Sequence, residues 1–297
     1  MALPNFLIIG AAKSGTTSIA SYLGQHPQVY MSPLKEPHFF AFEGEQLDLR
    51  GPAYREVHRT AVTDLETYQR LFQNVSNEIA IGEASTTYLV FPGTAERIKR
   101  YIPEVKLIVI LRHPVEKAFS SFLHLRRDGR EKSTDFIQAF NDSESRTLGN
   151  WTPLWLYKQM GFYYSQLQRY YNLFDRDQIK VYLYEDLHKN PLGLISDIYH
   201  FIGVDNTFVP DISIRENVSG IPRNRMIHSL LHSKNPIRNI LGNSYRKLPL
   251  SFRNSIRRSN LSKPVLPIEI RNELIDIYRE DILKLQVLIQ RELSVWL

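Results

Sequence analysis

The chain has 297 residues, of which 43% are apolar and 23% are charged, so it can bury a sizeable core and does not have the composition of a disordered protein. It contains no cysteine, which excludes a disulfide framework and a cysteine-rich zinc site. The formal net charge of +6 would suit an anionic ligand, although a well-solvated surface gives the same excess. Since no window reaches the roughly 18 apolar residues of a membrane span, and the first residues lack a secretory pattern, we predict a soluble, cytoplasmic protein.

Short apolar runs rich in β-branched residues alternate with helical patterns along much of the chain. The runs predict strands at residues 6–9, 78–82, 106–111 and 179–184, with a weaker candidate at 29–31. Helical spacing predicts helices at residues 18–23, 94–101 and 115–127. This alternation predicts an α/β fold, with a P-loop-like parallel sheet flanked by helices.

The rest of the chain predicts a cover for this sheet and one irregular segment. Residues 154–174 carry apolar and aromatic side chains at helical spacing, which predicts a helix packed on the core. Residues 214–263 hold eleven Lys or Arg against the single acidic Glu216, and three prolines interrupt them, so we predict an irregular basic arm. A helix over 267–293 should close the domain. We therefore expect one domain over residues 1–297, with the arm and the closing helix within it.

A glycine loop at residues 10–18 lies directly between a predicted strand and a predicted helix. A loop in this place directs backbone N–H groups and the positive end of a helix at one point, which is a common way to bind phosphate. Further donors come from the hydroxyls of Ser14, Thr16, Thr17 and Ser18. These features favour an anion site around Gly15 over the alternative, a plain glycine-rich turn that carries a solvated lysine.

The loop differs from the phosphate-binding loop of NTPases in the position of its lysine. Two glycines are separated by four residues as in that motif, but Thr16 replaces the nucleotide-gripping lysine and Lys13 lies inside the loop instead. The strand at 106–111 is followed by Arg112, where an NTPase would have the aspartate that helps to hold Mg²⁺. A kinase or NTPase therefore fits poorly, and we expect a second anion site and no metal.

Arg112 and Ser120 are candidates for this second anion site. Arg112 follows a predicted strand and Ser120 lies two turns into the next helix, so both can face the crevice at the carboxyl ends of the strands. The alternatives are an ion pair between Arg112 and Glu116, and a bond from Ser120 to its own helix.

The segment at residues 35–40 supplies candidate bases. Glu36 and His38 precede two phenylalanines that should bury and fix the segment. The transfer of an anionic group needs a base for the acceptor proton and a cation for the leaving oxygen, and Glu36 with Lys13 would provide this pair. The alternative for Glu36 is a solvated loop carboxylate.

These segments resemble the superfamily of sulfotransferases that use 3′-phosphoadenylyl sulfate (PAPS), especially its bacterial and heparan-sulfate-like members. Residues 12–17 are similar to the family's 5′-phosphosulfate loop, residues 111–120 to its 3′-phosphate element and residues 35–40 to the segment with the catalytic glutamate. The resemblance covers most of the chain. Heparan-sulfate-like enzymes usually carry a lysine at the position of Ala84, so a polysaccharide acceptor is not implied.

The resemblance implies in-line transfer of a sulfuryl group from PAPS to a hydroxyl or amine of an unidentified acceptor, such as a carbohydrate, lipid or small metabolite, without a metal. It implies Glu36 as the base, Lys13 at the leaving oxygen and the loop amides at the 5′-phosphate. His38 is the reserve base, because some sulfotransferases use histidine.

The same resemblance implies that Arg112 and Ser120 bind the 3′-phosphate. Residues 217–223 are similar to a segment that folds over the nucleotide, which makes Ser219, Gly220 and Arg223 secondary candidates for that phosphate.

Two further hypotheses remain open beside the sulfotransferase: a P-loop kinase or NTPase, and a non-enzymatic module that binds anions, nucleic acid or membranes through residues 214–263. We consider nucleic acid an improbable partner. Peripheral membrane contact through the arm is possible, but a solvated arm is favoured because surface charge runs usually have no partner.

Overall fold

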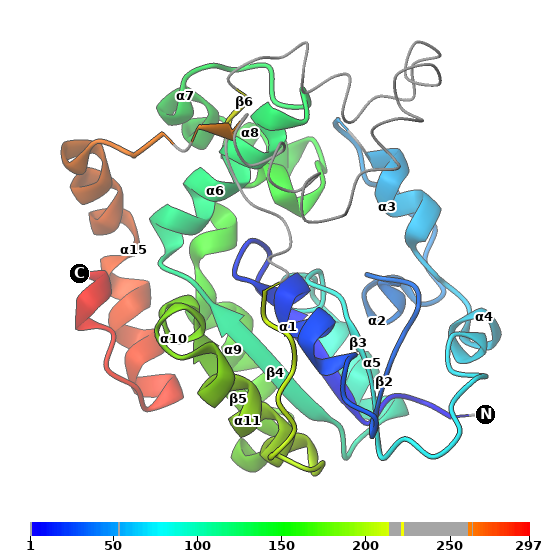
Figure 1. Ribbon diagram of the computed structural model, residues 1–297. Coiled ribbons are helices and arrows are strands. Elements are labelled where there is room, and N and C mark those ends of the chain that lie inside the picture. Colours follow the sequence, from blue (N-terminus) through cyan, green and yellow to red (C-terminus); the bar gives the residue numbers. More distant parts are fainter. Residues whose placement is uncertain (1, 53, 214–220, 223–260, 263) are drawn as a thin grey trace, which may run out of the picture.

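A computed structural model describes residues 2–52, 54–213, 221–222, 261–262 and 264–297. At its centre is a parallel five-stranded sheet with the strand order β2-β3-β1-β4-β5 (Figure 1). The strands are β1 (Phe6–Gly10), β2 (Val29–Met31), β3 (Ala80–Ala84), β4 (Lys106–Leu111) and β5 (Ile179–Leu183). The α/β fold with a parallel sheet flanked by helices is thereby confirmed, as are all five predicted strand positions to within two residues.

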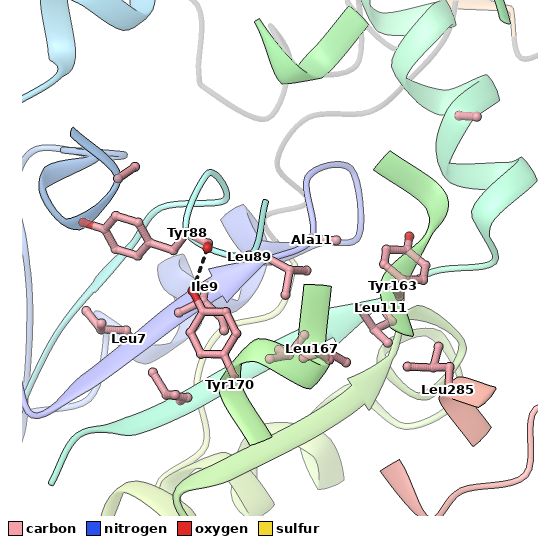
Figure 2. Close-up of a cluster of buried hydrophobic side chains, with 14 of the residues drawn as sticks. Leu7, Ile9, Ala11, Tyr88, Leu89, Leu111, Tyr163, Leu167, Tyr170 and Leu285 are labelled. Atoms are coloured by element: carbon pink, nitrogen blue, oxygen red, sulfur yellow. Dashed lines mark hydrogen bonds between the residues drawn. The ribbon is translucent and has the colours of Figure 1, made fainter. Parts of the chain in front are cut away.

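Helices cover both faces of the sheet because successive strand residues point to opposite sides. Phe6 and Ile8 of β1 face one hydrophobic core, which includes α1 (Thr16–Leu23) and α11 (Pro191–Ile202). Leu7 and Ile9 face a second core, formed with α5 (Thr94–Tyr101), α9 (Tyr163–Tyr171) and α15 (Ile268–Ile289) (Figure 2). Each fully buried aliphatic or aromatic side chain contributes roughly 1.5–3 kcal/mol, so these two cores hold the sheet in place.

The remaining helices cap the carboxyl ends and the edges of the sheet. They are α2 (Phe39–Phe42), α3 (Tyr54–Thr60), α4 (Leu65–Arg70), α6 (Pro114–Arg127), α7 (Phe136–Asn141), α8 (Ser143–Leu148) and α10 (Tyr184–Lys189). Short 3₁₀ turns are η1 (Pro153–Trp155), η2 (Gln159–Gly161), η3 (Arg176–Gln178) and η4 (Ser294–Trp296). None of the helices in the described ranges combines the length and the apolar character needed to cross a membrane.

The single helix predicted over 154–174 is wrong in its first half. Two 3₁₀ turns precede α9, which begins only at Tyr163. The carboxylate of Asp281 on α15 accepts from the backbone N–H of Tyr163 at 2.9 Å and of Tyr164 at 3.2 Å, and it thereby caps the helix at that point. The ring of Tyr278 packs so closely on Gly161 that a Cβ atom there would lie 2.6 Å from it, so this position requires glycine for space.

The closing helix is confirmed as α15, which ends at Ile289, somewhat earlier than predicted. Most of the predicted basic arm, with Ser219, Gly220 and Arg223, lies outside the described residues. The arm is not wholly irregular, because β6 (Ile221–Pro222) pairs antiparallel with β7 (Leu261–Ser262).

Candidate active site

A cavity of about 1230 Å³ lies at the carboxyl ends of the sheet strands. Each of the five strands is followed by at least one residue that lines it: Lys13 after β1, Glu36 after β2, Thr86 after β3, Arg112 after β4 and Tyr184 after β5. This is the edge at which open α/β sheets bind ligands, because the connecting loops diverge there. Candidates from three separate sequence segments thus meet in one site.

The glycine loop forms one wall of the cavity through Lys13, Gly15, Thr16, Thr17 and Ser18. Gly15 precedes α1 with a φ of 95°, a left-handed conformation that glycine adopts without strain. A Cβ atom there would lie 2.6 Å from the Leu187 side chain, so the position also requires glycine for space. Ser14 differs from the other predicted ligands, because it is fully buried, does not line the cavity and has an unpaired hydroxyl among the described residues.

Lys13 lies in a cationic environment. Burial, together with the guanidinium groups of Arg127 and Arg112, lowers the pKa of its ammonium from 10.5 to about 7, while the carboxylate of Asp128 opposes this shift. A cation held among other cations and away from water is stabilised when an anion binds beside it. The cluster is therefore suited to receive phosphate or sulfate.

Arg112 is held at the end of β4 by contacts on both sides of its side chain. Its guanidinium lies 4.4 Å from the centre of the Tyr184 ring and donates to the Lys13 carbonyl oxygen at 3.2 Å. The alternative of an ion pair between Arg112 and Glu116 is wrong, since Glu116 pairs with Arg271 at 3.3 Å. Ser120, on α6, is buried and lines the same cavity, as predicted.

Glu36 and His38 lie on a strained turn between β2 and α2. Both have left-handed backbone conformations, with φ of 56° and 59°, which residues with a side chain seldom adopt. The turn is attached to the end of β3, because the N–H of Glu36 donates to the Ala84 carbonyl at 3.2 Å and the N–H of His38 donates to the Ser85 hydroxyl at 3.1 Å. Backbone strain that the surroundings hold in place is typical of functional sites.

The two side chains have opposite protonation tendencies. Burial raises the pKa of the Glu36 carboxyl above its usual value, although the Lys35 ammonium and a hydrogen bond from the Thr86 hydroxyl at 3.3 Å oppose this rise. Burial lowers the pKa of His38 to about 4, so its imidazole is neutral at pH 7. The Glu36 side chain is 30% exposed, which excludes the alternative of a fully solvated carboxylate but leaves it accessible to a substrate. As a base, Glu36 is better matched to neutral pH than an ordinary carboxylate.

The sequence model of the Sulfotransferase family matches residues 4–208. The chain belongs to this family. A sulfotransferase from Alicyclobacillus acidocaldarius of known crystal structure is 34% identical and has a TM-score of 0.78, with 100% of this chain and 99% of that one covered. The predicted family and its bacterial affinity are thereby confirmed.

More distant members of the family act on sugars, according to their names. Human carbohydrate sulfotransferase 15 is 27% identical over 252 residues, which cover 68% of this chain and 44% of the human protein. The human bifunctional heparan sulfate N-deacetylase/N-sulfotransferase 2 is 28% identical over 212 residues, which cover 68% of this chain and 22% of that protein. The chain thus spans less than half the length of both relatives.

Sequence reasoning assigned no role to a buried carboxylate that underlies the Glu36–His38 turn. Glu83 is 1% exposed and accepts from the Ser85 hydroxyl at 2.9 Å and from the Tyr68 hydroxyl at 3.2 Å. Because the same Ser85 hydroxyl accepts from the backbone of His38, Glu83 fixes the turn indirectly. Burial raises the pKa of Glu83 to about 7. In the sequence, Glu83 could have been recognised as a charged residue at the end of a predicted buried strand.

A second missed group lies on α6 beside Lys13. His124 lines the cavity and accepts at Nδ1 from Arg127 at 2.9 Å, and Arg127 also pairs with Asp128 at 2.8 Å. His124 and Arg127 follow Ser120 by four and seven residues, so helical spacing places all three on one face. That periodicity could have identified them. Among the residues that the structure describes, no three His, Asp or Glu side chains gather closely enough to hold a metal ion.

Proposed function

We propose that this protein transfers a sulfuryl group from PAPS to a hydroxyl or amine of an acceptor. The observation that carries the proposal is the meeting of Lys13 and Glu36, a half-buried cation and a carboxyl with a raised pKa, in one cavity that Arg112 and Ser120 also line. In-line group transfer needs such a pair on opposite sides of the transferred group.

The donor would bind through both of its phosphate ends. The amides of the glycine loop and the hydroxyls of Thr16, Thr17 and Ser18 offer donors for the 5′-phosphate. Arg112 and Ser120 offer a guanidinium and a hydroxyl for the 3′-phosphate. The requirement for two separate phosphates distinguishes PAPS from ordinary adenine nucleotides.

In the proposed reaction, the acceptor oxygen or nitrogen attacks the sulfur while Glu36 takes its proton. The bond between sulfur and the 5′-phosphate oxygen breaks, and the negative charge that develops on this oxygen is neutralised by the Lys13 ammonium. His38, neutral and 3.9 Å from the Glu36 carboxylate, would orient that carboxylate rather than act as the base.

The relatives support both kinds of acceptor atom. The similarity to carbohydrate sulfotransferase 15 supports a sugar, which offers hydroxyls, and the similarity to an N-sulfotransferase supports an amine.

Ligand-dependent melting tests the donor assignment. Adenosine 3′,5′-bisphosphate (PAP), the spent donor, should raise the Tm strongly, and adenosine 5′-phosphate should raise it much less, because only PAP engages Arg112 and Ser120. Equal shifts, or a shift with ATP and Mg²⁺ alone, would contradict the proposal. A transfer assay with radiolabelled PAPS over cell extracts would then identify the acceptor.

A further inference from the structure

Lys117 is a buried cation in the wall of the cavity that the proposed reaction does not use. It lies on α6, three residues before Ser120, and is only 4% exposed. Its Nζ donates to the Met160 carbonyl oxygen on η2 at 3.0 Å. Both Lys117 and Met160 line the cavity.

The ammonium of Lys117 is incompletely paired. An ammonium has three donors, and in the described part of the chain its one hydrogen-bond partner is the Met160 carbonyl, with no carboxylate within ion-pair distance. Burial lowers the pKa of Lys117 to about 7, as expected for a cation that lacks a compensating charge. Buried charges are normally paired, because an unpaired one is costly to remove from water.

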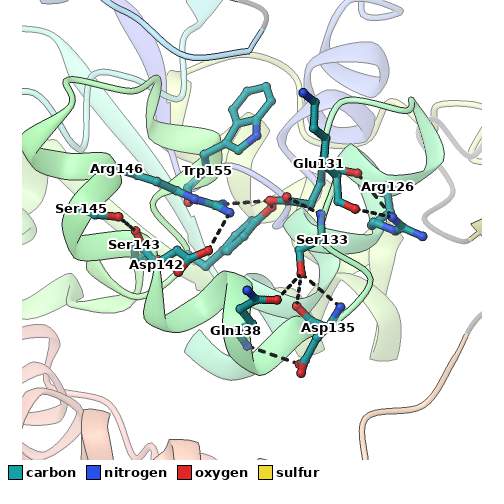
Figure 3. Close-up of polar contacts among 12 residues, drawn as sticks. Arg126, Glu131, Ser133, Asp135, Gln138, Asp142, Ser143, Ser145, Arg146 and Trp155 are labelled. Carbon is teal, nitrogen blue, oxygen red and sulfur yellow. Dashed lines mark hydrogen bonds and ion pairs between the residues drawn. The ribbon is translucent and has the colours of Figure 1, made fainter.

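A neighbouring buried cation shows what complete pairing looks like in this protein. Arg146 is 7% exposed and contacts the Glu131 carboxylate at 2.8 Å, the Asp142 carboxylate at 3.7 Å and the Trp155 carbonyl at 3.4 Å (Figure 3). The fold therefore supplies anionic partners for a buried cation in this region, but it supplies none of them to Lys117.

Other unpaired polar groups line the cavity as well. Gln166 on α9, Thr152 before η1 and Trp155 within η1 are each less than 8% exposed. Among the described residues, Gln166 Oε1, Thr152 Oγ1 and Trp155 Nε1 have no hydrogen-bond partner. Buried polar atoms are rarely left unpaired without a function, a ligand or a bound water.

Lys117 contacts a different wall of the cavity from the glycine loop. Its ammonium donates to Met160 on η2, whereas Arg112 donates to the Lys13 carbonyl oxygen of the glycine loop. The incompletely paired ammonium therefore belongs to the wall built by α6 and η2.

We infer that Lys117 forms a second anion subsite, on the wall built by α6 and η2, which binds a carboxylate, sulfate or phosphate group of the acceptor. This inference rests on the proposed function, since it assigns the acceptor to the part of the cavity that PAPS does not occupy. It names the acceptor class: a molecule that carries a negatively charged oxygen group besides the hydroxyl or amine that is sulfated.

Inorganic sulfate is the probe for this subsite. Protein saturated with PAP, which fills the donor site, is titrated with sodium sulfate at pH 6.5 and constant ionic strength, and the Tm is followed. Wild type should show a saturable rise, and Lys117→Met should bind sulfate roughly tenfold more weakly or not at all, as expected for the loss of a charge-assisted bond. Lys132→Met removes an exposed lysine and should behave as wild type.

Parallel measurements separate the other roles of Lys117. If it bound the 3′-phosphate of the donor, Lys117→Met would weaken PAP but not adenosine 5′-phosphate, and the acceptor subsite would be overturned. If it only tethered η2, the variant would melt at a lower temperature without anions and keep its sulfate response, which would also overturn the inference. Lys117→Arg, which retains the charge, should preserve the response.

The PAP titration distinguishes this inference from the proposed function. Wild type that fails to bind PAP contradicts the proposed function itself. Wild type that binds PAP, together with Lys117→Met that responds to sulfate like wild type, contradicts only the subsite.

Discussion

Lys13 combines two properties that conflict as long as no anion lies beside it. Its position inside the loop brings the ammonium to the cavity, but burial and the nearby Arg127 and Arg112 lower its pKa to about 7. A bound phosphate or sulfate would reverse this balance, because a neighbouring anion favours the charged form. Proton binding to Lys13 and donor binding should therefore be coupled.

We expect PAP binding to take up a proton at pH 8, where Lys13 is largely neutral in the free protein, and to take up less at pH 6. Calorimetry in buffers of different ionisation enthalpy measures this uptake directly. Lys13→Met should reduce the uptake and weaken PAP by roughly 10- to 100-fold, the range expected for a charge-assisted hydrogen bond. An uptake that is the same in Lys13→Met would assign the proton to another group.

Glu36 and His38 can be separated as bases. Glu36→Gln removes the proton acceptor but keeps the shape, so we expect the turnover rate to fall by about 10²- to 10⁴-fold while PAP binding is unchanged. His38→Gln should have a smaller effect, because burial holds the pKa of His38 near 4 and makes it a weak base. Single-turnover transfer from radiolabelled PAPS compares the two variants. A larger loss of transfer rate in His38→Gln than in Glu36→Gln would mean that His38 is the base.

At the scale of single elements, the sequence was sufficient wherever a local pattern decided the structure. The five strands and the helices α5 and α6 were predicted within two residues, because β-branched runs and helical periodicity are local signals. The start of α9 depends on the cap from Asp281, more than a hundred residues away, so no local pattern could reveal it. The same holds for Lys117, whose exposure and single hydrogen-bond partner exist only in the folded chain.

The junction of the glycine loop and α1 should depend on Gly15. Gly15→Ala would place a Cβ in a left-handed conformation, at a cost of about 1–2 kcal/mol, and against Leu187, at a further cost of about 1–3 kcal/mol. We expect a lower free energy of unfolding and weaker PAP binding. Gly44 is a matched control, since its φ is 70° but a Cβ there meets no atom within 4 Å, so Gly44→Ala should show only the backbone cost. Equal denaturant midpoints for the two variants would show that the contact with Leu187 adds no cost in stability.

At the scale of the whole molecule, buried carboxyl groups make stability depend on pH. Burial raises the pKa of Glu83 from 4.5 to about 7 and that of Asp281 from 3.8 to about 6. At these two groups the folded protein binds more protons than the unfolded chain between about pH 4 and 7, so their contribution to the free energy of unfolding falls as the pH rises through this window. Both groups lie under functional or structural turns, Glu83 beneath His38 and Asp281 at the start of α9.

Glu83→Gln tests this coupling, because a neutral side chain of the same shape removes the titration. The contribution of Glu83 is fully present below pH 4.5 and is lost as the pH rises through about 7, a change on the order of 3 kcal/mol for a pKa raised from 4.5 to about 7. The difference in Tm between Glu83→Gln and wild type should therefore shift in favour of the variant from pH 5 to pH 8. Glu66→Gln, which alters a carboxylate that is 69% exposed, should show no such trend. A difference for Glu83→Gln that stays constant with pH would mean that Glu83 is ionised throughout, and that its hydrogen bonds from Tyr68 and Ser85 outweigh its burial.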